Sequence, residues 1–305
     1  MNIAYVFFDL VHQPYCGFEY RVAELLNELG HRVFTVPRHR CLMEGVINIP
    51  DGVDVVYASN PIVLDVAVKV KEMIKKPLVV QFLDIPKPLL GSEEWRCKEY
   101  ERVKEQVKQA DSITAISETT AKDVEEWLGR KVDRVNYLGV DLDVYQAFQS
   151  KTGDYVCGVV RGLAKQKRAE EIIRGVETSK TKPKLELIHG NLSDPQKAKV
   201  MSGCIMGLGM STLEGFAIYL CEFGYYAKPF IGKRLPVFEE IYGDNIIYVE
   251  KPEEMAGKID WLMTDEEARA KAGANLANIV HEKRLYLSEH ALRLEKILCS
   301  ISETS

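Results

Sequence analysis

The sequence lacks the features of membrane-spanning, nucleic-acid-binding and disulfide-rich proteins. No uninterrupted apolar run approaches the ~18 to 20 residues that a membrane-spanning helix needs. The 305 residues carry a formal net charge of −5, so the basic surplus of a general nucleic-acid binder is absent and we expect no nucleic-acid partner. The seven cysteines are scattered and form no C-x-x-C pair, which is typical of reduced thiols. The first ten residues contain no basic signal-peptide segment, so we expect a cytoplasmic protein.

Metal-ligand and dinucleotide motifs are also missing. The six histidines are dispersed, and none is paired with a cysteine or carboxylate at ligand spacing, so we expect no metal site and no cofactor. The predicted loop at residues 10–18 carries one glycine, Gly17, and no G-x-G-x-x-G, which excludes a dinucleotide fingerprint there. His12 lies in the same loop, where a structural histidine is the common alternative to a catalytic one.

What the sequence contains is the pattern of a two-domain α/β protein. Hydrophobic residues make up 46% of the chain, and its length fits two domains better than one. The chain begins with a strand at 3–9, a helix at 19–30 and a strand at 32–36, a βαβ unit that favours a parallel sheet. A polar, irregular run at 143–153 predicts a linker between the domains. Further apolar runs predict strands at 53–57, 78–83, 112–116, 132–138, 155–160, 185–189 and 205–208.

The stretch 211–230 has the most informative spacing of polar residues. Glu214 and Glu222 lie eight positions apart, and Gly215 follows the first of them. We predict a loop that ends near Gly215 and a helix that starts just after it, whose first N–H groups and dipole would suit an anion or sugar hydroxyls. Eight helical residues rise roughly 12 Å, close to the reach of a sugar nucleotide. The alternative is two solvated carboxylates, since the chain has 45 acidic residues.

A basic turn follows the strand predicted at 155–160. Arg161, Lys165 and Lys167 lie between that strand and a helix predicted at 169–176. Cations at the carboxyl end of a strand, beside a helix N-terminus, are what a diphosphate site in an open α/β sheet requires. The alternative is an ordinary solvated basic turn.

These motifs together resemble family 4 of the retaining glycosyltransferases, which have the GT-B fold. The order Glu214-Gly215-Phe216, Glu222 and then 227–231 (AKPFI) is similar to the family's EGFG…E…GKPVI segment. The stretch 110–141 resembles the family's "vSe.t…lG….nGVD" block, and 236–263 resembles its C-terminal part.

The resemblance implies a fold and a role for each domain. We expect two Rossmann-like α/β domains that face each other across a cleft, with residues 1–145 on the acceptor side. Residues 153–285 would bind the donor, a nucleoside-diphosphate sugar such as a UDP- or GDP-sugar, and 286–305 would form a helix that crosses back to the first domain. The implied activity is metal-independent transfer of a sugar to an acceptor, with retention of configuration.

The resemblance also implies roles for individual residues. Arg161 and Lys167 would neutralise the donor diphosphate, with Lys165 as the alternative to Lys167, and Glu214 would bind hydroxyls of the sugar. Glu222 would bind the ribose. The other expected donor-site residues are Gly17, His189, Gly190, Gly215, Phe216 and Ala217. Asp84 and His12 are further candidate site residues, without an assigned role. The sequence departs from the family at Cys16, where the loop usually has a second glycine, and at Leu83, where many members have histidine.

Two other functions fit the same resemblance. One is a protein that binds a nucleotide sugar without transferring it, and the other is a sugar-nucleotide epimerase, since a fold does not determine a function. The acceptor stays open between a saccharide, a lipid and a small molecule. The lysines of the helix predicted at 62–75 are either an ordinary solvated surface or a contact with the inner face of a membrane; they are Lys69, Lys71, Lys75 and Lys76.

Overall fold

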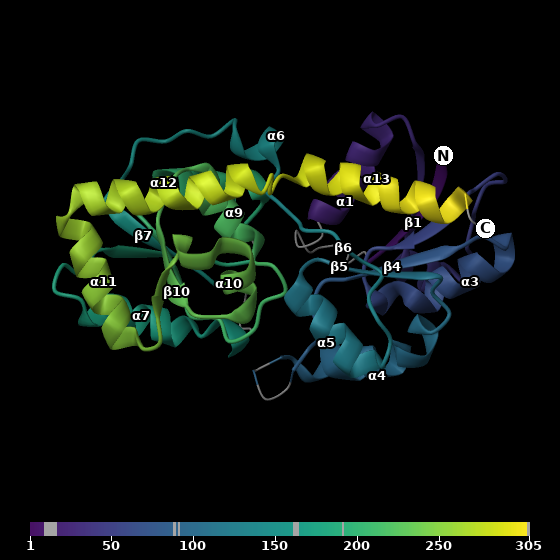
Figure 1. The fold of residues 1–305 in the computed structure, drawn as a ribbon, viewed down its shortest axis with the longest axis horizontal. Helices are drawn as coiled ribbons and strands as arrows, with labels where there is room; N and C mark the ends of the chain where they lie inside the picture. Colours follow the sequence, from purple (N-terminus) through teal and green to yellow (C-terminus); the bar gives the residue numbers. More distant parts are fainter. Residues whose placement is uncertain (9–16, 88–89, 91, 161–164, 191, 304–305) are drawn as a thin grey trace. The chain divides into compact units, whose positions relative to one another are not determined.

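The chain folds into two compact units, each built on a parallel β-sheet. The computed structural model describes residues 1–8, 17–87, 90, 92–160, 165–190 and 192–303. Unit 1 comprises Met1–Pro86, Glu94–Tyr137 and Leu287–Ser305, and unit 2 comprises Lys87–Glu93 and Leu138–Tyr286. Figure 1 shows helices on both faces of each sheet, which confirms the prediction of two Rossmann-like α/β units.

The sheet of unit 1 has six parallel strands in the order β2-β1-β3-β4-β5-β6. Its central strands are runs of apolar residues that are buried on both faces, as parallel strands between two helical layers must be. The strands are β1 (Asn2–Phe7), β2 (Arg32–Pro37), β3 (Val55–Ala58), β4 (Leu78–Phe82), β5 (Ser112–Ala115) and β6 (Arg134–Val135).

Two hydrophobic cores cover the faces of this sheet. Alternate residues of β1 point to opposite faces, so Ala4 and Val6 join one core while Tyr5 joins the other. The first core is closed by α3 (Leu64–Ile74), α4 (Glu94–Val107) and α5 (Glu118–Leu128). The second is closed by α1 (Gly17–Glu28) and α13 (Leu287–Glu303), which lie side by side in Figure 1.

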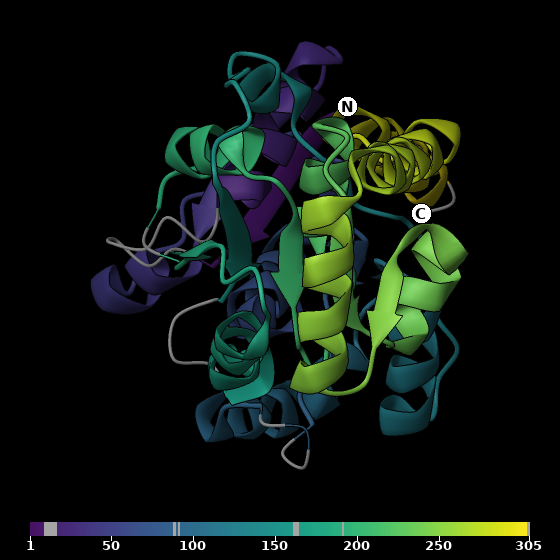
Figure 2. The same ribbon diagram turned by 90° about the vertical axis from the view of Figure 1, so that its left-hand side faces the viewer.

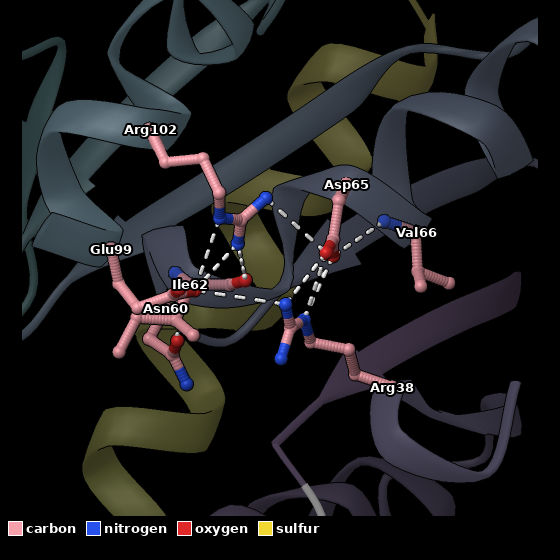
Figure 3. A network of polar contacts seen from close by, with 7 residues as sticks. All are labelled: Arg38, Asn60, Ile62, Asp65, Val66, Glu99 and Arg102. Atoms are coloured by element: carbon pink, nitrogen blue, oxygen red, sulfur yellow. Dashed lines mark hydrogen bonds and ion pairs between the residues drawn. The ribbon is translucent and has the colours of Figure 1, made fainter. Parts of the chain in front are cut away.

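An ionic network joins the short helix α2 (Arg38–Glu44) to α3 and α4 (Figure 3). Arg38 donates to both carboxylate oxygens of Asp65, with Nε–Oδ1 and Nη2–Oδ2 distances of 2.8 and 2.6 Å. Arg102 lies 3.4 Å from the same carboxylate and donates to Glu99 at 2.6 Å. Asp65 and Arg38 are each 15% exposed, and such half-buried, forked pairs hold a geometry better than single surface ion pairs do.

The sheet of unit 2 has five parallel strands in the order β11-β10-β9-β7-β8. Its strands are β7 (Tyr155–Val159), β8 (Lys184–Ile188), β9 (Gly207–Gly209), β10 (Phe230–Lys233) and β11 (Ile247–Val249). Helices α7 (Ala169–Thr178) and α11 (Pro252–Thr264) pack on one apolar cluster of this sheet. Figure 2 views this unit from its own side, with helices flanking the strands.

Helix α9 (Ile218–Tyr225) packs closely on β9 and on the long helix α12 (Glu266–Glu282). A Cβ atom on Gly207 of β9 would come within 2.6 Å of the Phe223 ring, so a glycine is needed for α9 to approach the sheet. The remaining helices of the unit are α6 (Leu142–Tyr145), α8 (Asp194–Gly203) and α10 (Pro236–Tyr242), with 3₁₀ turns at Lys165–Lys167 and Gly243–Asn245. One more 3₁₀ turn, Pro61–Val63, precedes α3 in unit 1.

The segments where the chain leaves and rejoins unit 1 run beside each other. Val140 N–H donates to the Leu285 carbonyl at 3.0 Å, and a Cβ on Gly139 would lie 2.2 Å from the Leu285 backbone. The strand predicted at 132–138 therefore shortens to β6, because the chain beyond it pairs with residues near 285. The predicted linker at 143–153 is also partly helical, since α6 begins at Leu142 and its N-cap Asp141 accepts from the Asp143 N–H at 3.2 Å.

Candidate functional site

The carboxyl edge of the unit 2 sheet carries the residues that the sequence motifs single out. Strands β7 and β9 are neighbours, and the chain runs from β7 to β8 on one side but from β9 to β10 on the other, so a topological switch point lies between β7 and β9. Ligands of open α/β sheets bind outside the carboxyl ends of the strands at such a point. The loop after β9 is tied to the turn after β7, because Thr212 N–H donates to the Gln166 carbonyl at 2.8 Å.

Lys167 and Glu214 form a buried ion pair at this point. Lys167 Nζ donates to Glu214 Oε1, and the two side chains are 8% and 9% exposed. The Tyr219 hydroxyl donates to the same carboxylate oxygen at 2.9 Å, and the lysine ammonium lies 5.2 Å from the centre of the tyrosine ring. Burial, and next the charge of Glu214, raise the pKa of Tyr219 well above its ordinary value, so the hydroxyl stays a donor.

The helix after Glu214 starts where the sequence predicts. Helix α9 begins at Ile218, and its N-cap, Ala217, has a φ of 61°, in the left-handed region. The Ala217 carbonyl accepts the first helical hydrogen bond, from Leu220 N–H at 2.9 Å. Phe216 and Ala217 are buried, so this turn is fixed by packing, and it holds the helix N-terminus beside the Lys167–Glu214 pair.

Glu222 lies one turn and a half along the buried face of α9 and is 3% exposed. Its Oε1 accepts from Lys197 Nζ at 2.7 Å, and the same ammonium lies 3.1 Å from Asp194 Oδ1. The second carboxylate oxygen, Oε2, is buried without a hydrogen-bond partner among the described residues. Burial lowers the pKa of Lys197, but the charges of Glu222 and Asp194 raise it more, so the lysine stays charged.

Tyr145 of α6 lies beside the Glu222 carboxylate and Lys197. Its ring lies 5.7 Å from the Lys197 ammonium, and its backbone carbonyl accepts from the Tyr226 hydroxyl at 2.8 Å. Burial, and next the Glu222 charge, raise the pKa of the Tyr145 hydroxyl well above its ordinary value. A cation, a carboxylate and a phenol therefore meet at Glu222.

The other predicted site residues are distributed over both units. Lys165 is exposed on the turn that carries buried Lys167, and His189 and Gly190 follow the carboxyl end of β8, where His189 is exposed. In unit 1, Gly17 is the first residue of α1, and Asp84 forms an ion pair with Arg96. Arg161 and His12 lie outside the described residues. The structure thus brings Lys167 and Glu214 into contact, and Gly215 to Ala217 with them.

Three residues of the site escape the sequence patterns: Tyr219, Lys197 and Tyr145. Tyr219 lies within the predicted helix, and its spacing of five from Glu214 could have indicated the contact. Lys197 belongs to a helix that the apolar pattern does not predict, although its Ser193-Asp194-Pro195 start is a typical capping sequence. Tyr145 lies in the stretch interpreted as a linker, and no sequence signal points to it.

Unit 1 has its own polar cluster at a switch point, between β1 and β3. Glu19 of α1 is 3% exposed, and its Oε1 accepts from the Ser59 hydroxyl and from Asn60 Nδ2, the latter at 3.1 Å. Asn60 also caps the 3₁₀ turn through a 3.0 Å bond from Ile62 N–H. Burial, and next the Glu19 charge, raise the pKa of nearby Tyr57 well above its ordinary value.

Over the described ranges, no three His, Cys, Asp or Glu side chains are grouped as metal ligands. Within the same ranges, none of the helices combines the length and apolar character that crossing a bilayer would take.

Comparison with known proteins identifies the fold. Neither a protein-family model nor a curated protein matches the sequence. Sucrose-phosphate synthase from Thermosynechococcus elongatus superposes with a TM-score of 0.77 at 10% identity, covering 99% of this chain and 100% of that one. HepE from Anabaena, in complex with UDP and glucose, gives 0.74 at 16% identity, over 97% and 99%. An alpha-glucosyltransferase in complex with UDP and a 13-mer DNA gives 0.64 at 11%, over 92% and 95%. The chain therefore has the GT-B fold of these proteins.

Proposed function

We propose that this protein is a glycosyltransferase that moves a sugar from a nucleoside-diphosphate sugar to an acceptor. The observation that carries the proposal is the buried Lys167–Glu214 pair at the switch point of unit 2. The similar structures include HepE with UDP-glucose, which supports a UDP-sugar as donor, with a GDP-sugar as the alternative. The motif order supports a family 4 type enzyme that retains the anomeric configuration.

The chemical task is to stabilise charge on the leaving diphosphate. The bond between the anomeric carbon and the diphosphate oxygen breaks, and negative charge grows on that oxygen as the sugar becomes oxocarbenium-like. Preorganised cations and N–H groups stabilise such charge best in a site that excludes water. We assign this role to Lys167, to Arg161 and to the start of α9 near Gly215 and Ala217, a set that needs no metal.

The two glutamates would hold the two ends of the donor. Glu214 would accept hydrogen bonds from hydroxyls of the sugar. Lys167 would contact both Glu214 and the diphosphate, so that the lysine lies between two anions. Glu222 would accept hydrogen bonds from hydroxyls of the ribose, and Lys197 orients that carboxylate through its 2.7 Å hydrogen bond to Oε1. His189 and Gly190 would lie near the donor, because they follow the strand next to β7.

The acceptor would bind to unit 1, in which Asp84 lies near the carboxyl edge of the sheet, two residues beyond the end of β4. Glu19 is a candidate acceptor-side group because it lies at that unit's switch point. A saccharide, a lipid and a small molecule all remain candidate acceptors. A lipid acceptor would bring the protein to the inner face of a membrane, as a peripheral and otherwise cytoplasmic protein.

Turnover of UDP- and GDP-sugars by purified protein tests this function, with Arg161→Ala and Glu222→Ala as variants and Lys199→Ala, at an exposed position on α8, as the control. We expect both variants to lose turnover while their circular dichroism stays unchanged. The control should keep most of the wild-type turnover. Full activity in both variants contradicts the proposal. Donor binding without transfer or hydrolysis would indicate a binding protein, and free nucleotide with an altered sugar would indicate an epimerase.

A further inference from the structure

One face of unit 1 exposes aliphatic side chains around an open groove. The groove has a volume of about 500 Å³ and is lined by Gly45, Ile47, Lys69, Glu72 and Met73. Next to the lining residues Gly45 and Ile47 in the sequence, the end of α2 exposes Leu42 and Met43, and Val46 is exposed as well. Met43 is 75% exposed and Met73 is 58% exposed, so more than half of each residue's surface faces solvent. Leu42, Met43, Val46 and Met73 together form what we call the α2–α3 surface.

This clustering is unusual for the molecule. Nine large hydrophobic side chains are exposed over the described residues, and four of them belong to the α2–α3 surface. Isolated exposed apolar residues are normal, but a group of them around a groove marks an interaction site. This face therefore has the character of an interaction site.

The charge beside the groove indicates the kind of partner. Lys69 lines the groove, and Lys75 and Lys76 follow at the end of α3; all three are exposed, with no ion pair to any described residue, whereas Lys71 is held by Asp111 at 2.7 Å. Three such lysines outweigh Glu72, although the whole chain carries a charge of −5. An anionic partner would meet attraction on this face and repulsion from the chain as a whole, so it would bind in one orientation.

The scaffold under the surface is fixed. Arg38 and Asp65 tie α2 to α3, and Arg102 and Glu99 extend the tie to α4 (Figure 3). Helix α2 ends at Gly45, whose φ of 68° lets the chain turn and project Val46 outward. The aliphatic side chains are thus presented on helices rather than on a free loop.

We propose that the α2–α3 surface rests on an anionic lipid bilayer. The four aliphatic side chains enter the boundary between headgroups and acyl chains, and Lys69, Lys75 and Lys76 contact the lipid phosphates. Aliphatic insertion combined with lysines is the pattern of peripheral membrane proteins, in which both contributions are needed for stable binding. The inference does not depend on a nucleotide or on the proposed transferase activity.

Flotation of the full chain with phosphatidylcholine vesicles, with or without phosphatidylserine, tests this proposal. We expect the protein to bind only the vesicles that contain phosphatidylserine, and we expect added salt to weaken this binding. Met43→Glu combined with Met73→Glu, and Lys69→Glu combined with Lys76→Glu, should each reduce binding at least tenfold. Trp261→Glu removes an exposed apolar residue of unit 2 (42% exposed) and should leave binding unchanged.

Each other result overturns the proposal. Absence of wild-type binding to phosphatidylserine vesicles contradicts it directly, as does equal binding by the Met43/Met73 variant. If sedimentation shows a dimer that this variant abolishes, while vesicles are not bound, a second copy of the chain covers the surface instead. Thermal unfolding of all variants checks that the substitutions, which are at exposed positions, leave the fold intact.

Discussion

Lys167 Nζ contacts Glu214 Oε1 while both side chains remain less than a tenth exposed. Removing one partner of a buried pair leaves a buried charge uncompensated, which costs about 3 kcal/mol or more. We therefore expect Lys167→Met to lower the free energy of unfolding by about 3 kcal/mol. Lys165→Met, on the same turn but exposed, should change it by less than about 0.5 kcal/mol. Urea denaturation of the two variants makes the comparison.

The double variant Lys167→Met/Glu214→Gln completes this test. Because it removes both charges together, it should lose less stability than Lys167→Met alone. The single variant Glu214→Gln is measured beside it. If the stability losses of Lys167→Met and Glu214→Gln add up to that of the double variant, or if Lys165→Met costs as much stability as Lys167→Met, then Lys167 and Glu214 are not a coupled pair.

Lys197 is predicted to hold Glu222 in place for the ribose. Lys197→Met would leave the Glu222 carboxylate buried beside Tyr145 without its cation, so we expect a loss of about 3 kcal/mol in stability and at least tenfold weaker nucleotide binding. Lys199→Met, two residues along the same helix, is the control. Titration calorimetry with UDP and GDP measures the affinity, and unchanged affinity in Lys197→Met would count against a role in binding.

The left-handed N-cap of α9 predicts a stabilising substitution. Ala217 has a φ of 61°, where an L-residue is strained and glycine is not. Ala217→Gly should raise the free energy of unfolding by up to about 1 kcal/mol. Ala270→Gly, at an exposed position inside α12, should lower it by about 1 kcal/mol. Thermal unfolding gives both values, and equal destabilisation by the two changes would show that Ala217 is not strained.

His290 predicts how stability depends on pH. It is fully buried in unit 1, with Nδ1 3.1 Å from the Tyr137 carbonyl, and burial lowers its pKa to about 4. The unfolded chain binds a proton near pH 6.5 while the folded chain does not, so stability falls as pH falls from about 6.5 to about 4. The loss from this residue is about 3 kcal/mol.

A comparison with His290→Gln isolates that contribution. The wild type should lose stability more steeply than His290→Gln between pH 7 and pH 4, as measured by urea denaturation at each pH. His281→Gln, at an exposed position, should follow the wild type. Parallel curves for the wild type and His290→Gln would contradict a buried neutral histidine.

Sequence patterns predict the sheets of this fold better than its small helices. Strands such as β1 are continuous apolar runs, and the helix after Ser117 has a cap whose side chain accepts from Thr120 N–H at 3.0 Å. Helix α2 buries none of its residues, so it has no apolar periodicity to recognise. The predicted strand at 132–138 is short because Gly139 and Val140 pair with a segment 146 residues later, which no local pattern contains.

Sequence motifs identified some residues of the candidate site, but not their contacts. Lys167 and Glu214 were identified from separate motifs, but their contact spans 47 residues and depends on β7 and β9 being neighbours. The pairing of Glu222 with Lys197 depends in the same way on α8 and α9 packing together. Periodicity and spacing describe one element at a time, and these pairs are set by the order of strands in the sheet.

The most direct test of the central claim is a thermal-shift panel of UDP-, GDP-, ADP- and dTDP-sugars on the wild type and on Glu222→Ala. A ligand at about 100 times its dissociation constant adds roughly 2.7 kcal/mol to stability. We predict that sugars of one nucleotide, UDP or GDP, stabilise the wild type and leave Glu222→Ala unchanged. No shift with any of these ligands, or the same shift in both proteins, would contradict a nucleotide-sugar site in unit 2.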